Sequence, residues 1–77
     1  MREVKKGERY RHFKGHEYII IAIAKDSEDL KEKIVYQDIN NPLNVWVRDK
    51  NEFLSLVDKN KYPDVLQKER FEKISDN

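Results

Sequence analysis

The sequence predicts one small, mainly β domain, either an antiparallel barrel or a curled sheet of four to five strands, with a short helical segment toward the C-terminus. Three observations support this prediction. Short runs of β-branched and aromatic residues alternate with turn residues at close spacing. The length of 77 residues leaves room for a single core. The chain contains no cysteine, so packing and not disulfide bonds has to stabilise it.

The first two strands are expected to form a hairpin. Residues 9–13 and 17–24 are rich in β-forming side chains, and residues 14–16 separate them. Gly15 suits the turn because it adopts positive φ without steric cost. The run 18–24 is apolar on both of its faces, which predicts a central strand covered on both sides.

Two further strands follow the hairpin. Residues 25–33 are polar and predict a loop or a single helical turn, and residues 34–38 form the third strand. The sequence Asn-Asn-Pro at 40–42 is a strong turn signal, because Asn tolerates the left-handed backbone and Pro removes a ladder donor. Residues 45–48 form the fourth strand.

Two helical segments are predicted after the strands. Asp49 stands at an N-cap position with Glu52 three residues later, which predicts a short helix there. Residues 63–71 begin with a proline and space their apolar side chains as a helix does, so they predict a second short helix.

Residues 9–74 are expected to form the domain. Residues 1–8 and 75–77 are nearly devoid of apolar side chains, so we expect them to be mobile tails. The core is predicted from the apolar positions of the strands and of the first helix: Ile19, Ile21, Ile23, Val35, Val45, Val47 and Phe53.

Composition also indicates the cellular location of the protein and the kinds of partner it has. The longest apolar run has seven residues, against the roughly 20 that a membrane-spanning helix needs. The basic N-terminus has no apolar stretch behind it, as a secretory signal would have. We therefore expect a cytoplasmic protein with no membrane partner and no cofactor, which also suits a chain without cysteine.

An ordered set of motifs runs through the chain. The block G-E-R-Y-R-H-F-K-G at 7–15 is followed by S-E at 27–28, V-Y at 35–36 and W-V-R at 46–48. In order and spacing the set resembles a bacterial family, domain of unknown function 1653, over roughly residues 7–57. The compact β domain of that family is similar to SH3-like barrels, so the resemblance implies an SH3-like fold. It implies no activity, because the family has no settled function.

The chain departs from the family pattern at two positions. Asp26 stands where the family has His before Ser-Glu, and Asp49 stands where it has Pro after W-V-R. No role of that histidine is carried over. The sequence R-F at 70–71 resembles a terminal family motif that follows an insertion around residues 59–67, which implies that Phe71 and Ile74 dock on the sheet.

Seven polar and aromatic residues of these motifs are candidates for a ligand site at one end of the sheet. Arginine binds oxyanions through two parallel hydrogen bonds, and Trp46 and Arg48 share a face of one strand. The simpler alternatives are that Arg11 and Arg48 form structural salt bridges with Glu17, Glu28 or Asp49, and that Trp46 is the centre of the core. The candidates are Arg11, His12, Lys14, Ser27, Glu28, Trp46 and Arg48.

Catalysis and metal binding have weaker support. His12 with Ser27 and Glu28 invites comparison with a nucleophilic triad, but no glycine-flanked nucleophile turn exists, and Ser27 and Glu28 equally suit a loop cap. His12 and His16 have a helical metal-ligand spacing, which loses its meaning in a hairpin. We therefore expect no enzyme and no metal site.

Two functions stay open on the sequence alone. The first is a module that binds a small anionic molecule or a modified peptide end through the seven candidates. The second is a nucleic-acid contact domain, because residues 1–16 carry six Lys or Arg and two Glu. The near-neutral total charge of +1 weakens the second function. Its phosphate track would be Arg2, Lys5, Lys6, Arg9, Arg11 and Lys14, with Tyr10 and Phe13 for stacking.

Overall fold

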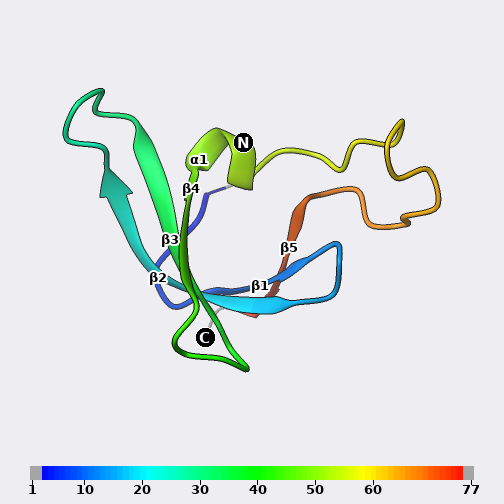
Figure 1. The fold of residues 1–77 in the computed structure, drawn as a ribbon, viewed down its shortest axis with the longest axis horizontal. Coiled ribbons are helices and arrows are strands. Elements are labelled where there is room, and N and C mark those ends of the chain that lie inside the picture. The colour runs from blue at the N-terminus through cyan, green and yellow to red at the C-terminus, as the bar shows by residue number, and fades with distance from the viewer. Residues whose placement is uncertain (1–2, 76–77) are drawn as a thin grey trace.

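The computed structural model describes residues 3–75 and shows one curled antiparallel sheet with a single short helix (Figure 1). The sequence-based fold class is confirmed in its curled-sheet form, and the barrel is not closed. The elements are β1 (Arg9–His12), β2 (Glu17–Lys25), β3 (Glu32–Asp38), β4 (Val45–Asp49), α1 (Lys50–Phe53) and β5 (Phe71–Ser75).

The strands are arranged in the order β4-β3-β2-β1-β5, so β4 and β5 are the two edges. The first four strands pair with their neighbours along the chain, whereas β5 returns to pair with β1 after a long loop. This loop extends to the same side of the molecule as the turn between β1 and β2 (Figure 1). No helix among residues 3–75 is long and apolar enough to cross a membrane.

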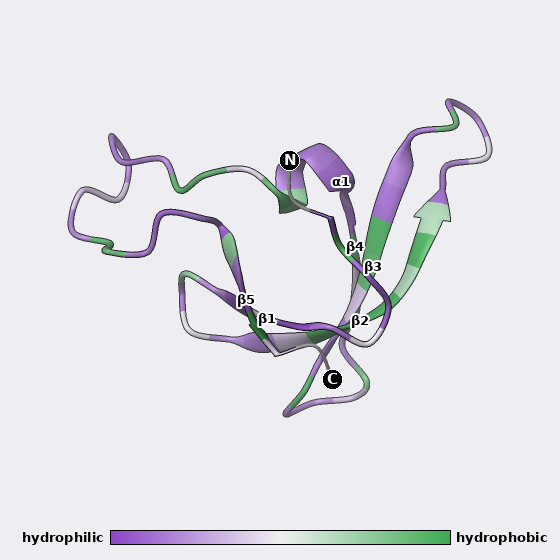
Figure 2. Ribbon diagram, turned by 180° about the vertical axis from the view of Figure 1, so that it is seen from behind, coloured by the Kyte–Doolittle hydropathy of each residue, from purple (hydrophilic) through white to green (hydrophobic). Residues whose placement is uncertain are grey.

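The core lies on one face of the sheet, which we call the inner face. It is largely aromatic: the Phe53 and Phe71 rings stack in parallel with centroids 4.1 Å apart, and Tyr10 and Tyr36 meet Phe53 edge-on. Figure 2 shows that hydrophobic residues concentrate along the strands and that α1 is mostly hydrophilic. The buried hydrophobic residues are Val4, Tyr10, Ile20, Ile34, Tyr36, Phe53, Val57 and Phe71.

The predicted core is therefore wrong except at Phe53. Ile20 is buried and pairs with Tyr36, while Ile21 has no partner in β3 because it is the extra residue of a β-bulge. Four of the predicted residues are exposed, namely Ile21, Ile23, Val45 and Val47, and Ile19 and Val35 are half-buried. β2 is central, as predicted, but its outer face is not covered.

The predicted helices have different outcomes. The helix after Asp49 is present as α1, although the Asp49 side chain makes no capping hydrogen bond. The second helix is wrong: residues 63–70 form turns and extended segments, and Phe71 begins β5. The physical reason is pairing, because β5 takes up the free edge of β1. Phe71 and Ile74 thus belong to the sheet itself, where the family resemblance implied docking on it.

The N-terminal boundary also needs correction. Val4 is in the core, and the Gly7 N–H donates to the Ile20 carbonyl with 2.9 Å between N and O. The buried Glu8 carboxylate accepts hydrogen bonds from the Lys5 N–H at 2.7 Å and the Tyr10 hydroxyl at 3.0 Å. The predicted tail 1–8 therefore packs on the domain from Val4 onward. Residues 1–2 and 76–77 of the predicted tails lie outside the described residues.

Candidate functional site

The β1–β2 turn, the inner face of β4 and the loop after α1 come together around His12. Two hollows, of about 220 and 390 Å³, lie here, and His12, Lys14 and Arg48 line both of them. The loop is joined to the turn through the Phe13 N–H, which donates to the Arg70 carbonyl with 3.0 Å between N and O. We call the two hollows together the His12 site.

Positively charged side chains dominate the larger hollow. Lys14, Lys61 and Arg70 form no ion pair with another residue in the range 3–75. The Arg48 guanidinium lies 3.7 Å from the Glu52 carboxylate and donates through Nε to the Tyr36 hydroxyl at 3.2 Å. Within the described chain, Arg48 is therefore the one cation of this hollow that has an ion-pair partner. The four cations that line the hollow are Lys14, Arg48, Lys61 and Arg70.

Asp58 is the one carboxylate that lines the larger hollow within the described chain. Its Oδ1 accepts the backbone N–H groups of Asn60 at 2.9 Å and of Lys61 at 3.3 Å. This is the hydrogen bonding of an Asx turn, which fixes the loop locally. Asp58 forms no ion pair in the described chain, so its carboxylate offsets the charge of the four cations only in part.

Aromatic rings dominate the smaller hollow. Tyr18 and Tyr36 meet edge-on with centroids 5.0 Å apart, and Phe71 lies 5.4 Å from Tyr36. Trp46 lines the same hollow, and 50% of its surface is exposed. The alternative that Trp46 is the centre of the core is therefore wrong, because β4 is an edge strand that leaves the indole at the rim.

His12 is the titratable group at the centre of the site. Its ring meets Phe71 edge-on at 4.9 Å, and its Nδ1 accepts the Lys14 N–H with 3.1 Å between the nitrogens. The proton of the neutral ring is then on Nε2, which is left as a donor. Burial, followed by the charges of Arg48, Arg70, Lys14 and His16, lowers the pKa of His12 from 6.5 to about 4. His12 is therefore neutral at pH 7.

Four of the seven predicted site residues come together here: His12, Lys14, Trp46 and Arg48. Arg11 does not, because neighbouring residues of a strand point to opposite faces. It lies near Glu17 at 3.4 Å and Glu72 at 3.9 Å on the two strands beside it. The salt-bridge alternative is confirmed for Arg11, and the partner of Arg48 is Glu52 and not one of the three acids expected.

Ser27 and Glu28 are also apart from the site. They lie in the turn between β2 and β3, at the far end of β2 from the β1–β2 turn (Figure 1). Nine residues of β2 separate the two turns, which corresponds to roughly 30 Å of strand. Both are exposed, and the Glu28 N–H donates to Asp26 Oδ1 at 2.8 Å. A triad of His12, Ser27 and Glu28 is therefore wrong.

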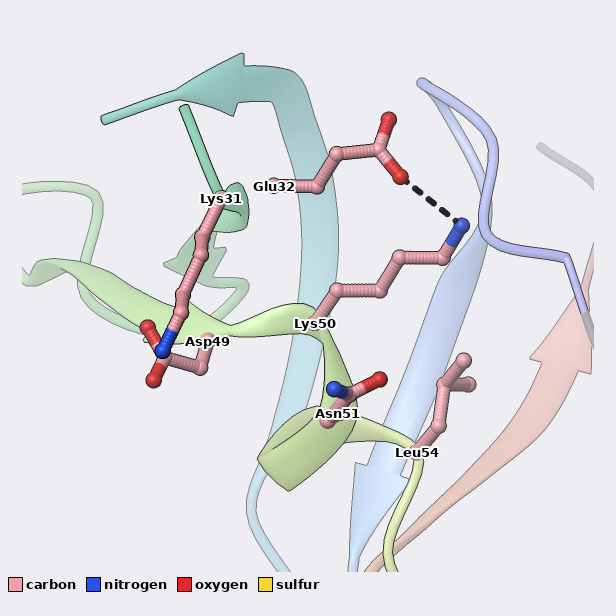
Figure 3. Close-up of a pocket in the computed structure, with 6 residues that line it drawn as sticks. All are labelled: Lys31, Glu32, Asp49, Lys50, Asn51 and Leu54. Carbon is pink, nitrogen blue, oxygen red and sulfur yellow. Dashed lines mark hydrogen bonds and ion pairs between the residues drawn. The ribbon is translucent and has the colours of Figure 1, made fainter. Parts of the chain in front are cut away.

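Another hollow, of about 520 Å³, is lined by residues in and beside α1, at the end of β4 and at the start of β3 (Figure 3). Its charges neutralise one another. Figure 3 shows the Lys50 side chain reaching the Glu32 carboxylate, at 3.1 Å, and Asp49 pairs with Lys33. Because these ions already have partners, this hollow is a weaker candidate than the His12 site.

The sequence reasoning missed the part of the site that comes from the long loop. Lys61, Tyr62 and Arg70 lie 49 or more positions beyond His12 in the chain, so no local pattern places them near it. The Phe13 and Tyr62 rings are in contact with centroids 4.8 Å apart. The one sequence signal for this part of the site was the R-F pair at 70–71, which resembles a family motif and directly follows the loop.

Metal binding has little support in the geometry. His12 and His16 line the same small hollow. Within residues 3–75, no group of three His, Asp or Glu side chains is arranged to hold an ion.

Comparison with known proteins places the chain in a family without giving an activity. The model of the family described as "Protein of unknown function (DUF1653)" matches residues 8–73. No curated protein and no solved structure matches the chain. The match covers most of the sequence and includes every strand residue from Arg9 to Lys73. The chain therefore belongs to the DUF1653 family.

Proposed function

We propose that the protein is a non-catalytic module that binds a small anionic ligand at the His12 site. The observation that carries this proposal is the gathering of Lys14, Arg48, Lys61 and Arg70 around one hollow, with Glu52 and Asp58 as the nearby acids already engaged. Bringing like charges together costs free energy, and an anion offsets that cost. Arginine and lysine also supply directional donors to carboxylate and phosphate.

The arrangement of groups supports binding over catalysis. A nucleophile needs a base within hydrogen-bond reach, and Ser27 is at the other end of β2 from His12. Burial and the surrounding cations also keep His12 a weak base, since its pKa is about 4. The His12 site thus presents hydrogen-bond donors without a nucleophile and base in contact, which suits binding.

The alternative of nucleic-acid contact through the N-terminal segment has less support. Tyr10, which would stack a base, is 1% exposed, and Arg11 pairs with Glu17. Lys14 points into the His12 site. Arg2 lies outside the described residues. Lys5, Lys6 and Arg9 are exposed and would carry such a contact.

A two-dimensional NMR titration with phosphate, pyrophosphate and succinate at moderate salt tests the proposal. We expect shifts that cluster on His12, Lys14, Trp46 and Arg48 and that saturate. Arg48→Gln should move saturation to about tenfold higher ligand concentration, and Arg11→Gln serves as the matched control because Arg11 lies on the outer face. Shifts confined to residues 5–9 would favour nucleic-acid contact, and no saturable shifts would contradict the proposal. The bacterial origin and the cytoplasmic location stay predictions from the sequence.

A further inference from the structure

We propose that the ligand of the His12 site is a nucleoside polyphosphate, with the base in the smaller hollow and the phosphate chain in the larger one. This inference rests on the proposed function and names its ligand class. It follows from the division of the site into one aromatic and one cationic hollow that share His12, Lys14 and Arg48. A ligand that fills both must combine a flat ring with an anionic chain.

The smaller hollow suits a planar ring. Trp46 presents a half-exposed indole at its rim, and Tyr18 and Tyr36 form the wall behind it. Stacking on an exposed aromatic side chain is the usual way in which proteins hold a nucleobase without reading its edges. The hollow, at about 220 Å³, is smaller than the sites that enclose a whole drug-sized ligand, so it accommodates one part of a larger molecule.

The larger hollow suits a chain of several phosphates. Its cations are spread over three elements, since Lys14 is in the β1–β2 turn, Arg48 in β4, and Lys61 and Arg70 in the long loop. A single carboxylate would meet only part of this set, whereas linked phosphates offer acceptors along its length. His12 lines both hollows, and because its Nδ1 accepts the Lys14 N–H, Nε2 is the nitrogen left to donate to a ligand.

Charge argues for a small nucleotide and against a nucleic-acid strand. The protein has a net charge of +1, and acidic residues such as Glu52 and Asp58 border the four cations. A long polyanion would meet these carboxylates and gain little from the remaining surface. A short triphosphate engages the local cluster alone.

Calorimetric titration of the full chain with ATP, AMP, tripolyphosphate and a single-stranded oligothymidylate tests the inference. Trp46 is the sole tryptophan, so its fluorescence reports on the base directly. We expect ATP to bind about tenfold or more tightly than AMP, because each charge-assisted contact contributes that much. ATP and AMP should quench Trp46, and tripolyphosphate should not. Lys61→Gln should weaken the binding of ATP and leave the affinity for AMP unchanged. Lys25→Gln, at the far end of β2, should change neither affinity.

The other outcomes separate the two proposals. Equal affinity for ATP and tripolyphosphate with unchanged Trp46 fluorescence would overturn the nucleotide inference and leave an anion site. Tighter binding of the oligothymidylate with a steep salt dependence would overturn it in favour of nucleic acid. If no phosphate compound binds, the nucleotide inference is wrong. The NMR titration with succinate then tests the proposed function: saturable chemical-shift changes at His12 and Arg48 would support an anion site, and their absence would contradict it.

Discussion

The two faces of the sheet carry similar apolar side chains but differ in burial. On the inner face, Ile20 and Ile34 are at most 1% exposed under Phe53 and Phe71. On the outer face, Val47 is directly opposite Val35 but is 64% exposed. The difference does not come from hydrophobicity. It comes from what the rest of the chain supplies as a cover: Phe53 of α1 and Val4 both belong to the core on the inner side.

The comparison teaches that period-two alternation finds strands but does not choose their buried face. In β2 both faces are apolar, and the bulge at Ile21 shifts the alternation within the strand. In β4 the branched residues Val45 and Val47 look like core positions, yet Trp46 and Arg48 take the inner face. Because Arg48 is on the inner face, it lies near His12. The orientation of β4 therefore explains both why Val45 and Val47 are not core residues and why the site forms.

The largest expected effect distinguishes two adjacent isoleucines. Ile20→Ala removes a fully buried side chain and should lower the free energy of unfolding by about 2–5 kcal/mol. Ile21→Ala, at a side chain that is 37% exposed, should cost only about 1 kcal/mol. Urea denaturation followed by circular dichroism measures both. Equal losses at the two positions would refute the bulge and the assignment of the inner face.

The next effect concerns the carboxylate that anchors the N-terminal segment. Burial alone raises the pKa of Glu8, but the Lys5 N–H, Lys73 and Tyr10 hydrogen bonds outweigh it and leave the pKa below 4.5. Glu8→Gln should destabilise the domain by about 2–3 kcal/mol at pH 7, because it removes charge-assisted bonds at a buried site. A depressed carboxyl pKa stabilises the fold above the unfolded value, so the loss should vanish as pH falls well below 4.5. The exposed Glu28→Gln is the control, and an equal loss there would contradict the role of Glu8.

The sequence predicts four of the five strands to within a few residues, because each is a short β-prone run between turn residues. It also predicts four residues of the site, because Lys14 lies in the turn that directly follows His12, and Trp46 and Arg48 share a strand face. β5 was not predictable from its own residues, since pairing with β1 defines it. Lys61 and Arg70 were missed for the same reason: the long loop brings them to His12 through non-local contacts.

A third prediction contrasts two arginines on opposite faces. Arg48→Gln should weaken pyrophosphate binding by about 1.5 kcal/mol, roughly tenfold, because it removes a charge-assisted contact. Arg11→Gln should leave the affinity unchanged, since Arg11 contacts Glu17 and Glu72 and lines neither hollow. Calorimetric titration measures both constants, with melting temperatures to confirm that each variant is folded. Equal weakening by both substitutions would show a diffuse charge effect without a site.

The last prediction, and the smallest effect near neutral pH, is a pH dependence of stability that belongs to His12. Its folded pKa of about 4 lies below its ordinary 6.5, so the unfolded chain binds the proton first as pH falls. The stabilisation is therefore complete above pH 6.5 and is lost progressively toward pH 4; by pH 6 the loss should be under about 1 kcal/mol. The charges that face the ring are Arg48, Arg70, Lys14 and His16, with Asp58 in the same hollow.

Between pH 5 and 6.5 this slope can be assigned to His12, because the Glu8 contribution is lost only below 4.5. His12→Asn should flatten the stability profile in that window, and His16→Asn should change it much less, because His16 is exposed and is only the last of several causes that lower the pKa of His12. Added phosphate should reduce the slope in the native chain, because a bound anion stabilises protonated His12 against the surrounding cations. A slope that persists in His12→Asn would mean that another group carries it and that folding does not lower the pKa of His12.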